Sequence, residues 1–201
     1  MKDYAMERKV YSDIKEVVNP DHTALIVWDV QKMLVDGIFN KEEFLSNLGF
    51  LISKAREVGM PVFFTKITPL PQEFESPARK YFSSRMKFNM SQIPKEMLDL
   101  AIEPKEGETV LNKNTASIFI GTNFELMARN AGIESLIIAG IATEIGVEST
   151  ARDSLNRGFY TVVAADASSS RNKEAHERSL ENMKMLFDVL DTKEIVNSIS
   201  K

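Results

Sequence analysis

The feature that most constrains the fold is a regular alternation of short apolar runs with segments whose apolar residues recur every three or four positions. The first run, residues 23–30 (TALIVWDV), is apolar on both faces, as is typical of a central strand covered by helices. A segment of helical period then begins at Asn40, which together with Glu43 predicts a capping box, and it ends at Gly59 and Pro61. The chain therefore begins with a strand followed by a helix.

The same alternation continues to the end of the chain. Further strands are expected at residues 62–65, 109–112, 136–140 and 161–166. Helices are expected at residues 122–132, 144–156 and 173–190. Strands separated by helices pair in parallel through right-handed crossovers. The sequence therefore predicts a three-layer α/β fold with a mainly parallel sheet flanked by helices.

The length of 201 residues favours a single domain spanning residues 1–201. Two segments interrupt the alternation within that domain. Residues 1–20 are polar and are expected to form an arm or a short helix on the outside. Residues 66–107 are rich in proline and predict a long irregular loop region, a kind of segment that is usually functional or disordered.

Composition narrows the possible functions. The chain has no cysteine, which excludes disulfides, thiolate metal sites and a cysteine nucleophile. With only His22 and His176, the sequence argues against a metal site, and the net charge of −4 argues against a nucleic-acid partner. No apolar run is long enough to span a membrane, and the N-terminus lacks a secretory signal. We expect a cytoplasmic protein that acts on a small molecule without a cofactor.

Polar side chains follow three of the predicted strands. Asp29 and Gln31 come after the first strand, Lys113 after the third, and residues 140–146 after the fourth. Ligands of open α/β sheets bind outside the carboxyl ends of the strands, so we expect these segments to converge. In a partly dry pocket Asp29 and Lys113 would favour each other's charged forms. That arrangement fits an acid–base unit and a structural ion pair equally well.

Residues 140–146 pass from a strand directly into a helix. We expect unpaired backbone N–H groups from Ala142 to Gly146 to face the site, where they could stabilise a developing oxyanion. A tight turn that needs Gly140 for its backbone geometry would explain the same pattern.

Taken together, these segments resemble the isochorismatase-like, or cysteine hydrolase, superfamily over about residues 20–190. The resemblance is carried by Asp29-x-Gln31, residues 110–113 (VLNK), 119–125 (FIGTNFE), 140–143 (GIAT) and 147–153 (VESTARD). It implies a Rossmann-like sheet, a catalytic triad of Asp, Lys and Cys, and a cis peptide that does not involve proline. It also implies a homo-oligomer, either a dimer or a tetramer.

By position, Asp29 and Lys113 match the first two members of that triad, and Ile141–Ala142 matches the cis peptide. Gly146 stands where the amidase branches of the superfamily carry their cysteine, so covalent acyl chemistry lacks its nucleophile. The isochorismatase branch also carries glycine there and hydrolyses a vinyl ether without a covalent intermediate. The resemblance therefore implies a hydrolase in which Asp29 is the general acid, Lys113 orients it, and Gly146 leaves room in place of a thiol.

The residues expected to contact a small anionic, isochorismate-like substrate are Gln31, Ile141, Ala142, Thr143 and Glu144. Isochorismatases typically carry an arginine and a tyrosine where this chain has Thr115 and Ala116, and a histidine where it has Glu144. These differences argue against isochorismate itself more strongly than against the chemistry.

Two alternatives stay open. The chain could be a catalytically inactive member that serves as a binding or scaffold subunit, because a fold does not determine a function. It could also be a hydrolase that uses Glu144 or a hydroxyl group from residues 66–107. Retained Asp29–Lys113 geometry beside an open pocket would favour non-covalent hydrolysis, whereas a side chain filling the pocket would favour the inactive subunit.

Three further features carry smaller expectations. Trp28 is expected in the core. His176 lies near Glu174 and Glu177 in the last helix and is expected at the surface or at an interface. The basic residues around Arg79 either cover an anionic substrate or form a solvated face.

Overall fold

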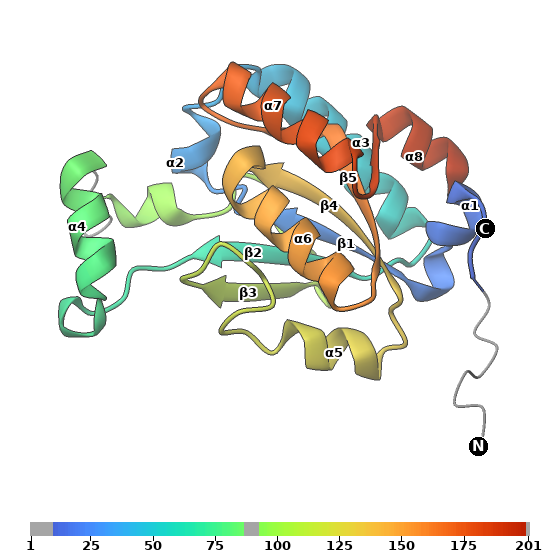
Figure 1. Cartoon of the computed structure of the whole chain (residues 1–201), viewed down its shortest axis with the longest axis horizontal. Helices are drawn as coiled ribbons and strands as arrows, with labels where there is room; N and C mark the ends of the chain where they lie inside the picture. Colours follow the sequence, from blue (N-terminus) through green and yellow to red (C-terminus); the bar gives the residue numbers. More distant parts are fainter. Residues whose placement is uncertain (1–9, 87–92, 200–201) are drawn as a thin grey trace.

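The computed structural model describes residues 10–86 and 93–199. It contains a parallel sheet of six strands in the order β3-β2-β1-β4-β5-β6 (Figure 1). The strands are β1 (Thr23–Trp28), β2 (Val62–Ile67), β3 (Thr109–Lys113), β4 (Ser135–Ile141), β5 (Tyr160–Ser169) and β6 (Asp188–Leu190). The predicted α/β fold with a parallel sheet flanked by helices is confirmed.

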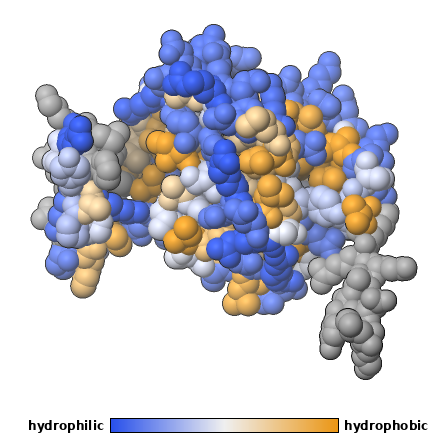
Figure 2. Space-filling model, in the orientation of Figure 1, coloured by the Kyte–Doolittle hydropathy of each residue, from blue (hydrophilic) through white to orange (hydrophobic). Residues whose placement is uncertain are grey.

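Helices cover both faces of the sheet (Figure 1). One face packs against α1 (Ile14–Val17), α3 (Lys41–Glu57) and α8 (Thr192–Ser198). The other face packs against α5 (Phe124–Asn130), α6 (Glu148–Asn156) and α7 (Lys173–Lys184). Side chains of β1 alternate between the two, with Leu25 and Val27 toward α3, and Ile26 and Trp28 toward α5 and α6. Figure 2 shows hydrophilic residues along the outer faces of α6 and α7, as expected for helices that bury one side only.

The strand order reverses between β1 and β4, which are neighbours in the middle of the sheet. Trp28 at the end of β1 pairs with Gly140 near the end of β4. Open α/β sheets bind ligands at such a reversal, outside the carboxyl ends of the strands. The residues that follow Trp28 and Gly140 are therefore placed where a ligand site is expected.

The prediction that residues 66–107 are irregular is wrong in part for residues 66–86 and 93–107; residues 87–92 lie outside the described part. Strand β2 continues to Ile67, and the segment contains the ten-residue helix α4 (Pro77–Met86). Pro77 suits the first turn of a helix, where its missing N–H removes no intrahelical hydrogen bond. Helix α4 stands away from the body of the molecule, beyond the carboxyl ends of β2 and β3 (Figure 1). Short 3₁₀ turns at Gln72–Phe74 and Lys95–Leu98 flank it, and the one-turn helix α2 (Lys32–Val35) follows β1.

The last predicted helix is also shorter than expected. It ends at Lys184, and Asp188–Leu190 instead forms the edge strand β6 beside β5. Val189 packs on the α5–α6–α7 side of the sheet and Leu190 on the opposite side, which is the alternation of a strand. Met183 and Phe187 are four residues apart, which is a helical spacing, and this explains why the predicted helix extended past Lys184.

The predicted capping box at the start of α3 is absent. Asn40 is the N-cap residue, but its side chain makes no capping hydrogen bond and instead accepts one from the Ser169 hydroxyl at the end of β5. The polar N-terminal segment is described from residue 10 and contains the short helix α1; residues 1–9 lie outside the described part. Across residues 10–86 and 93–199, every helix is too short or too polar to traverse a lipid bilayer.

The close pairing of β1 with β4 depends on a glycine. Gly140 has φ +131°, and a Cβ atom there would lie 2.1 Å from the carbonyl oxygen of Trp28. We expect Gly140→Ala to lower the free energy of unfolding by about 3 kcal/mol or more, from the strained φ and from overpacking. Gly132 is the matched control: its φ is +72°, but no atom lies within 4 Å of the position that a Cβ would take. Gly132→Ala should cost only about 1–2 kcal/mol. Equal losses in urea denaturation would contradict this reading.

Candidate functional site

Asp29 directly follows β1 and is the central residue of the candidate site. Its carboxylate is buried, with 2% of the residue exposed. Its φ is +48°, which makes it the one non-glycine residue with a left-handed backbone in the described part of the chain. Strained backbone of this kind is concentrated at functional sites, although aspartate tolerates it better than most residues.

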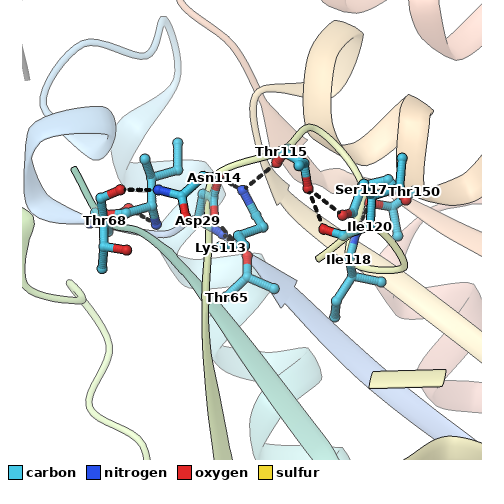
Figure 3. A network of polar contacts seen from close by, with 12 residues as sticks. Asp29, Thr65, Thr68, Lys113, Asn114, Thr115, Ser117, Ile118, Ile120 and Thr150 are labelled. Atoms are coloured by element: carbon cyan, nitrogen blue, oxygen red, sulfur yellow. Dashed lines mark hydrogen bonds and ion pairs between the residues drawn. The ribbon is translucent and has the colours of Figure 1, made fainter. Parts of the chain in front are cut away.

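Both oxygens of the Asp29 carboxylate accept hydrogen bonds from neighbouring strands (Figure 3). The Thr65 hydroxyl on β2 donates to Oδ1 at 2.6 Å, and its own oxygen accepts from the Asp29 backbone N–H at 3.0 Å. Lys113 at the end of β3 donates from Nζ to Oδ2 at 2.6 Å. The predicted convergence of Asp29 and Lys113 is thus present, held by three adjacent strand ends.

Lys113 is as deeply buried as Asp29, with 2% of the residue exposed. Its ammonium also donates to the Thr115 carbonyl at 3.1 Å and lies 3.8 Å from the centre of the Trp28 ring. The loop after β3 is itself braced, because the Asn114 amide donates to the Thr68 carbonyl and the Thr115 hydroxyl bonds backbone within the loop (Figure 3). The ammonium therefore has a fixed position.

Burial controls the protonation of this pair. It raises the pKa of Asp29 above its ordinary value of 3.8, and the charge and hydrogen bond of Lys113 and the Thr65 hydroxyl oppose that rise. Burial likewise lowers the pKa of Lys113, which Asp29 opposes, while the positive charge of Arg79 on α4 lowers it further. A buried carboxyl group with a raised pKa is easier to protonate, and in its protonated form it can donate a proton to a ligand.

The segment after β4 forms the second part of the site. The Ile141–Ala142 peptide is cis, as the resemblance implied. A π-helical turn, Thr143–Val147, then leads into α6. The N–H groups of Ile145, Gly146 and Val147 all point to the Ala142 carbonyl, at 3.2, 3.0 and 3.3 Å. The expectation that the N–H groups from Ala142 to Gly146 are unpaired is therefore wrong for Ile145 and Gly146, because the Ala142 carbonyl accepts from both.

The expected room at Gly146 is not present. A Cβ atom at this position would lie 1.7 Å from Nε1 and 2.1 Å from Cε2 of Trp28. Trp28 is in the core as predicted, with 1% of the residue exposed, and its indole fills the space where a side chain at position 146 would stand. The periodicity of the strand could place Trp28 in the core but could not show which residue it meets.

Gln31 lies close to this pair, and its amide is committed to the backbone. Its Oε1 accepts from the Ile67 N–H at 2.8 Å, and its Nε2 donates to the carbonyls of Ile67 at 3.2 Å and Leu98 at 2.6 Å. The residue is fully buried. Gln31 joins the end of β2 to the turn at Lys95–Leu98, and its amide nitrogen is used in hydrogen bonds to backbone carbonyls.

Thr143 and Glu144 lead away from the pair toward α7. The Thr143 hydroxyl lies 2.8 Å from His176 Nδ1 and 3.1 Å from the Ser169 carbonyl. His176 is 7% exposed within the single chain, so its expected position at the surface or at an interface is wrong. Its spacing from Leu180 and Met183 would have placed it on the buried face of the helix.

Burial lowers the pKa of His176, and the charge of Glu144 opposes that change. Glu144 itself accepts from the Ser170 hydroxyl at 2.7 Å through Oε1. These hydrogen bonds connect the turn at Thr143–Val147 to α7 and to the end of β5. As for metal ligands, residues 10–86 and 93–199 bring no three histidine or acidic side chains together.

Sequence reasoning missed Thr65 as a member of the site. The sequence did indicate this role, because a hydroxyl residue near the carboxyl end of a strand beside β1 can reach Asp29. The strand order needed to see this neighbour relation was not evident from the pattern alone.

The chain matches known proteins over most of its length. The isochorismatase domain family matches residues 23–194. An uncharacterized isochorismatase family protein, YecD, of Escherichia coli O157:H7 is 30% identical over 195 residues, which cover 90% of this chain and 98% of the relative. The ureidoacrylate amidohydrolase RutB of Pseudomonas syringae pv. syringae is 28% identical over 196 residues, which cover 85% of this chain and 80% of that enzyme.

Among solved structures, a cysteine hydrolase from Pseudomonas syringae pv. phaseolicola has the same fold. Its TM-score is 0.81 at 18% sequence identity, and the match covers 96% of this chain and 98% of that one.

Because the ion pair is buried, removing one partner should lower the free energy of unfolding by an amount that depends on pH. Lys113→Met should lower the free energy of unfolding at pH 7 by about 3 kcal/mol, because it leaves a buried carboxylate unpaired. Without the opposing lysine the folded-state pKa of Asp29 rises further, so the cost should shrink as the pH falls below that pKa and Asp29 becomes neutral. Urea denaturation of both proteins from pH 7 to pH 4 checks this, and a cost that stays constant with pH would contradict it.

Proposed function

Because the chain belongs to the isochorismatase family, we propose that it is a hydrolase that cleaves a small anionic enol ether without a covalent intermediate. The observation that carries this proposal is the buried Asp29–Lys113 pair, 2.6 Å apart at the carboxyl ends of β1 and β3. Asp29 is the general acid, and Lys113 holds it in place.

The residues around the pair support a reaction with no nucleophilic side chain. The chain has no cysteine, and Gly146 offers no atom beyond its backbone. The relatives named as amidohydrolases support hydrolysis as the reaction class. In this chain an amide substrate would meet no thiolate to attack it, so hydrolysis through a protonated substrate and water fits the residues present.

In the proposed reaction, Asp29 transfers its proton to the terminal methylene carbon of the enol ether. The neighbouring carbon becomes an oxocarbenium ion, and water adds to it and loses a proton to the Asp29 carboxylate. The resulting hemiketal breaks its bond to the alcohol oxygen, which takes up a proton, giving a ketone and a free alcohol. For an enolpyruvyl ether, the ketone is pyruvate. The raised pKa of Asp29 favours the protonated form that starts the reaction.

The charges near the pair favour an anionic substrate. The charge of Lys113 is compensated by Asp29. Arg79 on α4 adds a positive charge that lowers the pKa of Lys113, and its side chain is 43% exposed. Arg79 also has Glu75 at 3.8 Å, a longer and weaker contact than the 2.6 Å bond of the buried pair. A partly exposed guanidinium on the helix beyond the carboxyl ends of β2 and β3 is suited to binding a carboxylate on the substrate.

A second candidate is a catalytically inactive subunit that binds a ligand or a partner. The observation that favours it is the filled space beside Gly146, together with the deep burial of Asp29 and Lys113. On this alternative the ion pair is structural and no enol ether is consumed.

Pyruvate release from isochorismate and from other enolpyruvyl ethers, coupled to NADH oxidation, separates the two candidates. We expect Asp29→Asn to reduce kcat/KM about a hundredfold to ten-thousandfold, as for loss of a general acid. The wild-type rate should fall as the pH rises through the raised pKa of Asp29. Glu108→Gln is the matched control, because it breaks an ion pair with Arg56 (2.7 Å) at the opposite end of β3 from Lys113 and should leave the rate unchanged. Folded wild-type protein that consumes none of these ethers would favour the inactive subunit.

Arg79 gives a second prediction. Arg79→Gln should raise KM for an anionic enol ether about tenfold and leave kcat within about twofold, since the guanidinium binds the substrate but moves no proton. Lys80→Gln, at the next position of α4, is the control. Equal effects of the two variants on KM would show that α4 acts only through its general charge.

A further inference from the structure

Gly146 has no conformational reason to be glycine. Its φ lies outside the left-handed range that Gly140 and Gly132 occupy, so a side chain would meet no backbone strain there. The obstacle is spatial: the three heavy atoms nearest a Cβ at this position, at 1.7, 2.1 and 2.6 Å, all belong to the Trp28 indole. The side chain at position 28 therefore determines what position 146 can hold.

The same indole contacts the catalytic pair. Trp28 is the residue before Asp29, and Lys113 Nζ lies 3.8 Å from the centre of its ring. One edge of the ring thus faces Gly146 while one face carries the ammonium that donates to Asp29. With 1% of Trp28 and 2% of Lys113 exposed, little water competes for this contact, and a desolvated cation–π contact is the strong kind.

We propose that Trp28 and Gly146 form a matched pair in which the indole takes the volume of a side chain at position 146 and positions the Lys113 ammonium on Asp29. Trp28 is then a positioning residue, and it commits the site to chemistry without a nucleophile at position 146. This role rests on the proposed function only where it concerns catalysis. Its steric and electrostatic parts can be measured in the absence of any substrate.

The steric part is tested by a double-mutant cycle with Gly146→Ala and Trp28→Leu. We expect Gly146→Ala alone to lower Tm by about 6 °C or more, as for overpacking in a domain of this size. In the Trp28→Leu background the same change should lower Tm by less than about 2 °C, because the smaller side chain leaves room for a Cβ atom. Gly49→Ala is the control, since nothing lies within 4 Å of a Cβ there. Additive effects of the two substitutions would overturn the matched pair.

The electrostatic part can be read from fluorescence, because Trp28 is the single tryptophan of the chain. We expect Lys113→Met to change the emission maximum and intensity of the folded protein, since it removes the cation from the ring face. Arg129→Met is the matched control: it removes a cation that lies 3.8 Å from the ring of Phe159. Unchanged emission in folded Lys113→Met would overturn the contact between Trp28 and the ammonium.

The catalytic part needs a readout that a purely structural residue would not move. Trp28→Phe keeps an aromatic face toward Lys113, whereas Trp28→Leu does not. We expect Trp28→Phe to retain at least tenfold more of kcat than Trp28→Leu, with similar KM values in the two variants. Equal losses of kcat would restrict Trp28 to filling space and would refute its positioning role. Because the Tm cycle and the emission spectra need no turnover, failure of the matched pair can be told apart from failure of the proposed hydrolysis.

Discussion

The candidate site depends on one interaction, the buried ion pair between Asp29 and Lys113. Removing two charges from water is costly, and such a pair is tolerated only when its remaining hydrogen-bonding capacity is satisfied. Here the carboxylate also accepts from Thr65, and the ammonium also donates to the Thr115 carbonyl and lies over the Trp28 ring. An arrangement of this kind holds a carboxyl group in a dry environment without leaving either charge unpartnered.

The sheet explains why these groups meet. Asp29, Thr65 and Lys113 lie at the carboxyl ends of β1, β2 and β3, which are consecutive neighbours in the sheet. Gln31 ties the end of β2 to the turn at Lys95–Leu98, so the segment that carries α4 leaves the sheet and returns to it beside the pair. The parallel topology thus brings the Asp29 carboxyl group and its hydrogen-bond partners together at one edge of the sheet.

Much of this could be predicted from the sequence because it follows from periodicity. A strand that is apolar on both faces ends at Asp29, and another ends at Lys113; their convergence needs only the rule that parallel strands end at one edge. The features that were not predicted are contacts between side chains and groups that are distant in the sequence. The indole of Trp28 beside Gly146 and the capture of the Gln31 amide by backbone groups follow from strand order and local turns. The helical spacing of His176 from Leu180 and Met183 indicates a buried position. The acidic residues Glu174 and Glu177 beside it led to the wrong expectation of an exposed one.

The proposed role of Asp29 as a proton donor requires that burial raises its pKa, and a ¹³C NMR titration of its carboxyl carbon measures that pKa. The titration needs no substrate and observes the group itself. We expect the pKa of Asp29 to lie above the ordinary value of 3.8 in the wild-type protein. We also expect a still higher value in Lys113→Met, where the opposing positive charge is gone. A carboxyl group that stays ionised below pH 3.8 in the folded protein would contradict a proton-donor role and identify the pair as a structural ion pair.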